Sequence, residues 1–283
     1  MTGLPTPGLG TGCPVVWGVL NVTPDSFSDG GRFDSIDRAI EHGQRMRKQG
    51  ADVIDVGGES TRPGARRVSS DEEKRRVLPV VEALAAEGMT VSIDTMRSEV
   101  AIAAVDRGAG IVNDVSGGRA DAAMHTVVAG LAVPYVIMHW RGHSERMDEL
   151  AAYDDPVRQV RDEIARQVAV AVDAGIDRGS IIVDPGIGFA KNPGHNWSVL
   201  RSLDSWRDLG LPVLVGASRK RFLGELLVDA AGEPRDAGAR DVATAVLSGL
   251  LALKGAVWGL RVHDVQSTVD GLKVVGAMGG EAS

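Results

Sequence analysis

Three polar residues, Asp94, Asn113 and Asp184, each end a short apolar run that is typical of a buried strand. An unpaired carboxylate at such a place is costly to desolvate, so a partner must satisfy it. A flat heterocycle with an exocyclic amine beside a ring nitrogen would do so, because a carboxylate accepts two parallel N–H bonds from that edge. The alternative for each position alone is a helix cap, since Asp and Asn are good caps. Three such residues at three strand ends favour a ligand site.

Basic residues gather at other strand ends, although the chain as a whole carries a net charge of −7. They are Arg62, the run Arg219–Arg221, Arg261 and His263. Arginine forks bind phosphate and carboxylate oxygens, while Lys220 offers a point charge to a ring oxygen or nitrogen. The pattern predicts a local anion site, with either Arg219 or Arg221 expected to be a solvated surface residue instead.

Two polar, glycine-rich stretches, 23–31 and 57–64, follow the first two predicted strands. Loops of this composition on the active face of a barrel are candidates for mobile lids. Asn21, with Asp25 or Asp29 in the first stretch, offers oxygen ligands that suit Mg²⁺ held partly by the phosphates of a substrate. Zinc is not predicted, because the sequence has one cysteine and no His-Glu-x-x-His motif.

The histidines outside the basic cluster divide into two groups. His42 and His125 lie within predicted helices and His195 precedes one, so a structural role is the simpler interpretation. His139 directly follows an apolar run at a strand end and is therefore a candidate for a functional role.

All these residues need a scaffold that brings the strand ends together. Short β-branched runs bounded by glycine, proline or polar residues predict eight strands, at 15–22, 52–56, 90–93, 111–112, 133–138, 180–183, 212–215 and 257–262. Helical patterns alternate with them at 35–48, 70–86, 96–106, 121–129, 156–174, 196–209, 240–254 and 265–277. Ser70 and Glu73 have the spacing of a capping box at the start of the second helix.

Eight βα units predict an α/β fold of the TIM (β/α)8 barrel type in a single domain, which gathers the carboxyl ends of the strands on one face. The alternative is a doubly wound open sheet, but the Gly-x-Gly-x-x-Gly signature of its dinucleotide-binding form does not follow the first strand. We expect the barrel domain to span residues 15–278, between a flexible N-terminal segment at 1–14 and a flexible tail at 279–283.

Length, charge and cysteine content limit the class of protein. The 283 residues are enough for one large domain, and the net charge of −7 gives no global positive field that would hold nucleic acid. No apolar run approaches the roughly 20 residues that cross a bilayer. The single cysteine fits a reducing compartment. We therefore expect a cytoplasmic protein without nucleic-acid or membrane partners.

Eight motifs follow one another along the chain: Gly18-Val-Leu-Asn-Val-Thr-Pro-Asp-Ser-Phe-Ser-Asp-Gly-Gly31, Asp55-Val-Gly-Gly-Glu-Ser-Thr-Arg-Pro-Gly64, Ser92-Ile-Asp-Thr, Asn113-Asp, Met138-His, Asp184-Pro-Gly-x-Gly-Phe189, Ser218-Arg-Lys and Arg261-Val-His-Asp264. Taken in order, these motifs closely resemble the dihydropteroate synthase family, and its actinobacterial members most of all. Each motif alone is moderately specific, whereas all of them in register make an accidental match implausible. The resemblance runs from Val15 to the last helix.

The resemblance implies a homodimeric barrel that joins 4-aminobenzoate to 6-hydroxymethyl-7,8-dihydropterin pyrophosphate. The products would be 7,8-dihydropteroate and pyrophosphate, with Mg²⁺ as the metal and sulfonamides as inhibitors. By resemblance, the pterin is held by Asp94, Asn113, Asp184 and Lys220, with Met138, Phe189 and Arg261 near its ring. Pyrophosphate and Mg²⁺ contact Asn21, Arg261 and His263.

The same resemblance places the 4-aminobenzoate site where the two loops close. Its residues are Phe27, Thr61, Arg62, Pro63 and Phe189, and Asp29 lies in the first loop. The residues expected to take part in catalysis are Asp29, Arg62, Lys220, Arg261 and His263. Arg221 stands where many relatives have serine, which leaves open whether this position binds through its side chain or its backbone.

Two other functions remain as alternatives. A pterin-binding methyltransferase domain would have no use for a pyrophosphate clamp, so Asp29, Arg62, Arg261 and His263 argue against it. A paralogue that binds pterin without catalysis is disfavoured by the intact set of Asn21, Asp94, Asp184, Lys220 and Arg261.

Overall fold

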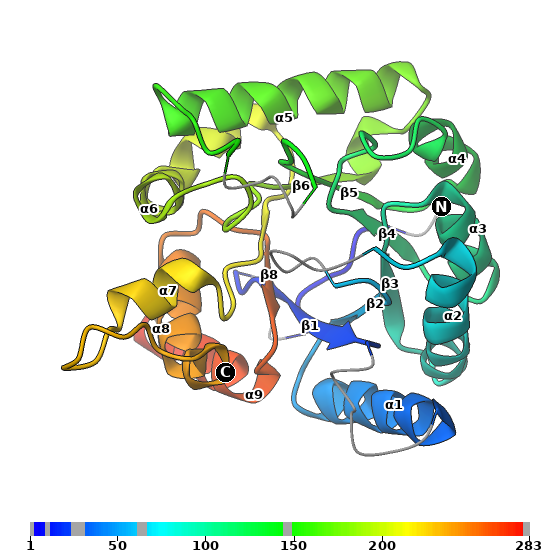
Figure 1. Cartoon of the computed structure of the whole chain (residues 1–283), viewed down its shortest axis with the longest axis horizontal. Coiled ribbons are helices and arrows are strands. Elements are labelled where there is room, and N and C mark those ends of the chain that lie inside the picture. Colours follow the sequence, from blue (N-terminus) through cyan, green and yellow to red (C-terminus); the bar gives the residue numbers. More distant parts are fainter. Residues whose placement is uncertain (1–2, 9–11, 24–31, 61–66, 144–148, 280–283) are drawn as a thin grey trace.

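The computed structural model describes residues 3–8, 12–23, 32–60, 67–143 and 149–279. Eight parallel strands form one sheet in the order β6-β5-β4-β3-β2-β1-β8-β7. A parallel bridge between Val183 and Val213 links the two outer strands, so that the sheet closes into a barrel. Helices surround this ring of strands (Figure 1). The predicted TIM barrel is confirmed.

The strands match the predicted apolar runs closely. Nearly every strand residue is buried or half-buried, because the barrel interior covers one face and the helices cover the other. The strands are β1 Val15–Asn21, β2 Val53–Gly57, β3 Thr90–Asp94, β4 Ile111–Asp114, β5 Tyr135–Met138, β6 Ile181–Asp184, β7 Leu214–Val215 and β8 Gly259–Val262.

The helices follow the predicted alternation with strands. They are α1 Arg32–Lys48, α2 Ser70–Ala86, α3 Ser98–Asp106, α4 Met124–Leu131, α5 Pro156–Asp173, α6 Pro193–Arg201, α7 Arg221–Leu226, α8 Asp241–Leu253 and α9 Val265–Gly279, with 3-10 turns at η2 Arg178–Ser180, η3 Leu203–Leu209 and η4 Ala237–Ala239. The short helix α7 was not predicted, because six residues are too few to show a helical period. The predicted helix at 196–209 is divided into α6 and η3.

The predicted capping box of α2 is wrong by one residue. Ser69 is the N-cap, and its Oγ accepts from the backbone N–H of Glu72 at 3.2 Å. Glu73 is 1% exposed and accepts instead from Oγ1 of Thr95, at 2.6 Å. Its carboxylate thus connects α2 to the end of β3.

The barrel interior is built in two layers. The lower layer is apolar and comprises Val15, Trp17, Val53, Ile111, Val136, Ile182 and Leu214. Strand residues of the opposite parity, such as Ile54 and Val112, pack with helix residues in the larger core. Because side chains on one face of a strand recur every two residues, positions two further along point into the same interior.

Those upper positions are polar. Asp55 lies two residues after Val53, Asn113 two after Ile111, and Asp184 two after Ile182. The strands therefore place a polar layer directly above the apolar one, at the carboxyl end of the barrel. We refer to Asp55, Asp94, Asn113, Asp184 and Arg261 as the polar layer.

None of the helices formed by the described residues is long and apolar enough to cross a membrane.

Candidate active site

The polar layer is tied together by Arg261, which extends inward from β8. Its Nη2 lies 3.1 Å from Oδ2 of Asp184, and its Nη1 lies 3.4 Å from Oδ1 of Asn113. The amide nitrogen of Asn113 donates to Oδ2 of Asp55 at 2.8 Å. An added Cβ at Gly216 would lie 2.9 Å from Nη2 of Arg261, so glycine at this position leaves room for the guanidinium. Arg261 thus connects its own strand, β8, to β4 and β6.

Acidic groups outnumber basic ones in this buried layer. Burial raises the pKa of Asp55 against the opposing effect of Arg261. Burial, together with the neighbouring charge of Asp55, raises the pKa of Asp94 well above its usual range. Oδ1 of Asp55 is buried and has no hydrogen-bond partner among the described residues. A ligand with N–H donors would satisfy such acceptors.

A cavity of about 660 Å³ opens above the polar layer. Of the residues proposed from the sequence, six line it: Asn21, Asp94, Phe189, Lys220, Arg261 and His263. Three others, Asn113, Met138 and Asp184, are fully buried beside these lining residues. Met138 packs in one apolar cluster with Phe189. The structure therefore brings nine predicted residues to one face of the barrel.

Lys220 and Phe189 form one wall of the cavity. Nζ of Lys220 lies 4.0 Å from the centre of the Phe189 ring. Burial first, and then the charge of Arg261, lowers the pKa of Lys220 to about 8. The ammonium is therefore poised to donate to a ligand, and the ring offers a flat apolar surface beside it.

The other wall is basic and contains residues that sequence reasoning did not assign to a site. His42, for which the sequence predicted a structural role, lines the cavity together with Arg45 of α1. His263 contacts Oγ of Ser218 through Nδ1 at 3.0 Å. Arg219 also lines the cavity, but Asp241 binds its Nε at 2.6 Å and its Nη2 at 2.7 Å.

Arg221 is the solvated member of the basic run. Its side chain is exposed and pairs with Glu225 within α7, at 3.2 Å. The sequence predicted that one of Arg219 and Arg221 would be a surface residue, and the structure identifies it as Arg221.

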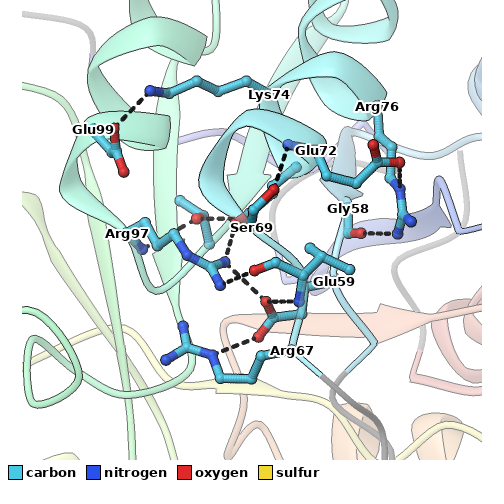
Figure 2. Close-up of polar contacts among 12 residues, drawn as sticks. Gly58, Glu59, Arg67, Ser69, Glu72, Lys74, Arg76, Arg97 and Glu99 are labelled. Atoms are coloured by element: carbon cyan, nitrogen blue, oxygen red, sulfur yellow. Dashed lines mark hydrogen bonds and ion pairs between the residues drawn. The ribbon is translucent and has the colours of Figure 1, made fainter.

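The stem of the second loop is held by Glu59 (Figure 2). Its Oε1 accepts from Nε of Arg67 at 3.2 Å, and its Oε2 accepts from the backbone N–H of Val68 at 3.2 Å. Nη1 of Arg97 lies 2.8 Å from the same Oε2, and this guanidinium also pairs with Glu73. Glu59 therefore joins the residues before and after 61–66 to each other and to the start of α3.

Several predicted residues cannot be placed. Asp25, Phe27, Asp29, Thr61, Arg62 and Pro63 lie outside the described residues. Asp55 is a polar residue of this site that the sequence analysis did not predict. The parity of β2 was the available signal, since Asp55 follows the inward-facing Val53 by two positions.

Two of the remaining histidines have structural roles. The ring of His125 contacts the backbone oxygen of Gly117 at 3.1 Å, and His195 completes a capping box with Asn192. His139 is fully buried and lies 2.9 Å from both Glu163 and Lys191.

The described residues offer few ligands for a divalent cation. No group of three or more His, Cys, Asp or Glu side chains capable of holding a metal occurs among the described residues. Asn21 presents one amide group to the cavity at the end of β1. A single protein oxygen fits Mg²⁺ bound mainly by water and substrate phosphates, and does not fit a metal caged by protein.

Comparison with known proteins agrees with this geometry. Residues 17–263 match the model of the family described as pterin binding enzyme. The chain is 56% identical to dihydropteroate synthase of Mycobacterium leprae over 93% of its own length and 92% of that protein. A structure of Xanthomonas albilineans dihydropteroate synthase with 4-aminobenzoic acid superposes with a TM-score of 0.86 at 43% identity, covering 94% of this chain and 93% of that one. The same enzyme in complex with 7,8-dihydropteroate gives 0.83 at 40% identity, with 94% of each chain covered.

The expected family resemblance is confirmed by both sequence and structure. The chain belongs to the pterin binding enzymes and, among them, to the dihydropteroate synthases.

Proposed function

We propose that this chain joins 6-hydroxymethyl-7,8-dihydropterin pyrophosphate to 4-aminobenzoate, giving 7,8-dihydropteroate and pyrophosphate. The observation that carries the proposal is a layer of buried acids at the floor of a cavity that also has a basic wall. Such a site suits a ligand with N–H donors at one end and phosphate charge at the other. The similarity to a synthase bound to 4-aminobenzoic acid, and to the same enzyme bound to 7,8-dihydropteroate, supports the same chemistry here.

The polar layer is proposed to bind the pterin. Asp184 and Asp94 would accept hydrogen bonds from the amine and ring nitrogens, and Lys220 would donate to a ring oxygen or nitrogen. Asn113 offers both a donor and an acceptor and is already oriented by Asp55 and Arg261. Binding would supply N–H donors to carboxylates that the protein alone leaves poorly compensated.

The wall formed by Phe189 and Lys220 is proposed to face 4-aminobenzoate. The ring of Phe189 would pack against the benzoate ring. The ammonium of Lys220 lies 4.0 Å from the centre of the Phe189 ring and would therefore also lie near the bound 4-aminobenzoate. Phe27, Thr61, Arg62 and Pro63 remain proposed members of this site, on the basis of the family resemblance.

The basic wall is proposed to hold the pyrophosphate. Arg261 and His263 line this part of the cavity together with Asn21, which would be the protein ligand of Mg²⁺. When bound there, Mg²⁺ would neutralise charge on the leaving pyrophosphate. Asp29 and Arg62 are proposed to complete the catalytic set.

The reaction needs no covalent intermediate with the protein. The bond between the pterin methylene carbon and the pyrophosphate oxygen breaks, and the electron pair leaves with pyrophosphate. The lone pair of the aromatic amine then attacks the methylene carbon, and the nitrogen loses a proton. The protein stabilises the leaving group, orients the weak nucleophile and excludes water that would otherwise trap the cation.

The test is pyrophosphate release by the purified protein with Mg²⁺, the pterin pyrophosphate and 4-aminobenzoate. We expect release that requires 4-aminobenzoate, is competed by a sulfonamide, and falls about 100-fold in Asp184→Asn, since charged hydrogen bonds are lost. Lys48→Met, an exposed change on α1, is the control and should match the wild type. Pterin binding without release in the wild-type protein would instead establish a non-catalytic pterin binder.

We also propose that the chain forms a homodimer through α8 and α9. Val242, Val246, Leu250 and Leu253 are each at least 55% exposed and recur along α8 at helical spacing. Val274 and Met278 extend this apolar surface on the neighbouring α9. Sedimentation of Val246→Glu should give a monomer where the wild type gives a dimer, and a wild-type monomer would refute the proposal.

A cytoplasmic location is also proposed, on the grounds of composition. The chain has a single cysteine and therefore no internal disulfide framework, which is typical of proteins of a reducing compartment. Fractionation of cells that produce the protein would test this location, and recovery outside the cytoplasm would contradict it.

A further inference from the structure

A second cluster of buried charges lies outside the cavity, against the loop that joins β6 to α6. At its centre is Lys191, which is 4% exposed. Its ammonium donates to the backbone oxygens of Gly186 at 3.0 Å and Phe189 at 3.1 Å, and it lies 2.9 Å from Nδ1 of His139. These three contacts use all three donors of an ammonium group.

His139 connects the ammonium to a carboxylate. Its Nε2 lies 2.9 Å from Oε2 of Glu163 on α5. Burial, and then the charge of Lys191, lowers the pKa of His139 to about 3, so the ring is neutral at ordinary pH. Because Nδ1 faces the ammonium and accepts from it, the ring proton stands on Nε2 and is donated to Glu163. A neutral imidazole therefore bridges a buried cation and its counter-charge.

Arg141 completes the cluster on the solvent side. Its Nη2 lies 2.6 Å from Oε1 of Glu163, and its Nε lies 3.1 Å from Oε2. The guanidinium also stacks on Tyr153, at 3.8 Å from the ring centre, and binds the backbone oxygen of Ala152 at 2.7 Å. Arg141, which follows β5, therefore helps to hold the carboxylate of Glu163 in place.

The loop held by Lys191 is conformationally demanding. Gly186 has a φ of 63°, and a Cβ there would clash with the backbone oxygen of His139. Ala190 also adopts the left-handed region, with a φ of 46°, which disfavours any residue with a side chain. A loop of this kind persists only when its surroundings fix it. Lys191 provides this constraint by binding two of its carbonyl groups at once.

The two carbonyl groups belong to residues that shape the cavity. The backbone N–H of Gly186 donates to Oδ1 of Asp184 at 2.7 Å, and the ring of Phe189 packs against Lys220. We propose that Lys191, whose charge is balanced by Glu163 through His139, is a positioning residue. It holds Asp184 and Phe189 in the positions that the two substrates require. The inference rests on the proposed function only for the identity of those substrates.

The first experiment replaces Lys191 by Met, with Lys48→Met as the exposed control. We expect the KM for 4-aminobenzoate and the dissociation constant of 7,8-dihydropteroate each to rise about tenfold or more, because displacement of positioned groups weakens binding. Loss of folded protein alone would lower kcat and leave both constants unchanged. A folded Lys191→Met variant with wild-type values of both constants would refute the proposal.

The second experiment uses pH and does not require the lysine variant to fold. Burial lowers the pKa of Lys191 to about 7, while Asp184 and Glu163 oppose this shift. Removal of the Glu163 charge lowers the pKa of Lys191 further. If the charged Lys191 holds the loop, binding of 7,8-dihydropteroate weakens as Lys191 loses its proton. In Glu163→Gln this weakening must therefore begin at a lower pH than in the wild type. The charged and titratable groups that face the ammonium are His139, Arg141, Glu163, Asp184, His195 and Lys220.

Asp162→Asn, on the same helix and half-buried beside Arg158, is the matched control and should keep the wild-type profile. An unchanged midpoint for the dissociation constant of 7,8-dihydropteroate in Glu163→Gln would refute the link between Glu163 and Lys191. Because this readout is a binding constant, it stays informative if the wild-type protein shows no condensation, a result that would refute only the proposed function.

Discussion

The ammonium of Lys220 lies over the ring of Phe189, with Nζ 4.0 Å from the ring centre. The two residues come from different segments, after β7 and after β6, so their contact joins these two segments in one wall of the cavity. A cation at this distance from an aromatic face is attracted by the ring. The same ammonium is near Asp184 and Asp94, yet burial keeps its pKa at about 8.

Lys220 should therefore support activity while weakening the fold at neutral pH. Its folded pKa of about 8 lies below the ordinary 10.5, so below pH 8 the buried charge reduces stability, and this penalty disappears as pH rises toward 10.5. We expect Lys220→Met to lose about 100-fold in kcat/KM. At pH 7 it should be at least as stable as the wild type, with a smaller difference at pH 9.5. Urea unfolding at both pH values is the measurement, and a variant that is less stable at pH 7 would contradict this account.

Arg97 should be needed for a low KM for 4-aminobenzoate, because it holds Glu59 and Val68 at the two ends of the second loop. Replacement by Met removes its ion pairs with Glu59 and Glu73, which are almost completely buried. We expect the KM for 4-aminobenzoate to rise about tenfold, since a displaced loop mispositions its residues. Steady-state kinetics with Lys74→Met as the control would test this, because the pair of Lys74 with Glu99 is exposed (Figure 2) and worth at most about 1 kcal/mol. Equal KM values in the two variants would exclude this role for Arg97.

Arg221 should be dispensable as a side chain. Its side chain is 59% exposed and pairs with Glu225 of the same helix at 3.2 Å, so Arg221→Ala is expected to change the KM for 4-aminobenzoate by less than about twofold. A tenfold rise in that KM would show that the side chain turns toward the substrate. The measurement decides whether this position acts through its backbone, the question that the sequence left open.

The sequence predicted the barrel well because its signal is local. Most strands are short, mainly apolar runs, and several of them end in a polar residue such as Asp94 or Asp184. The small helix α7 gave no period, and Asp55 was overlooked inside a strand that continues to Gly57. The family resemblance supplied the expected roles of most proposed site residues, and the alternation of side chains along β2 would have pointed to Asp55.

Long-range partners were beyond the reach of sequence patterns. Glu163 lies 24 residues from His139, and Lys191 lies 52 residues from it, with no spacing rule that connects them. His139 was singled out only because it follows a strand, and its partners became visible when α5 and the loop before α6 were placed against it. The same holds for Arg97 and Glu59, which meet because α3 begins beside the end of β2.

The two-layered barrel interior separates folding from recognition along each strand. In β2, β4 and β6 a residue of the apolar base and a residue of the polar layer, which is proposed to face the ligand, are two positions apart. A substitution at Val53, Ile111 or Ile182 is expected to affect the closure of the barrel, whereas one at Asp55, Asn113 or Asp184 is expected to affect what the barrel binds. Descendants of such a chain can exchange their ligand by changing the upper position of each strand, while the lower position continues to specify the same architecture.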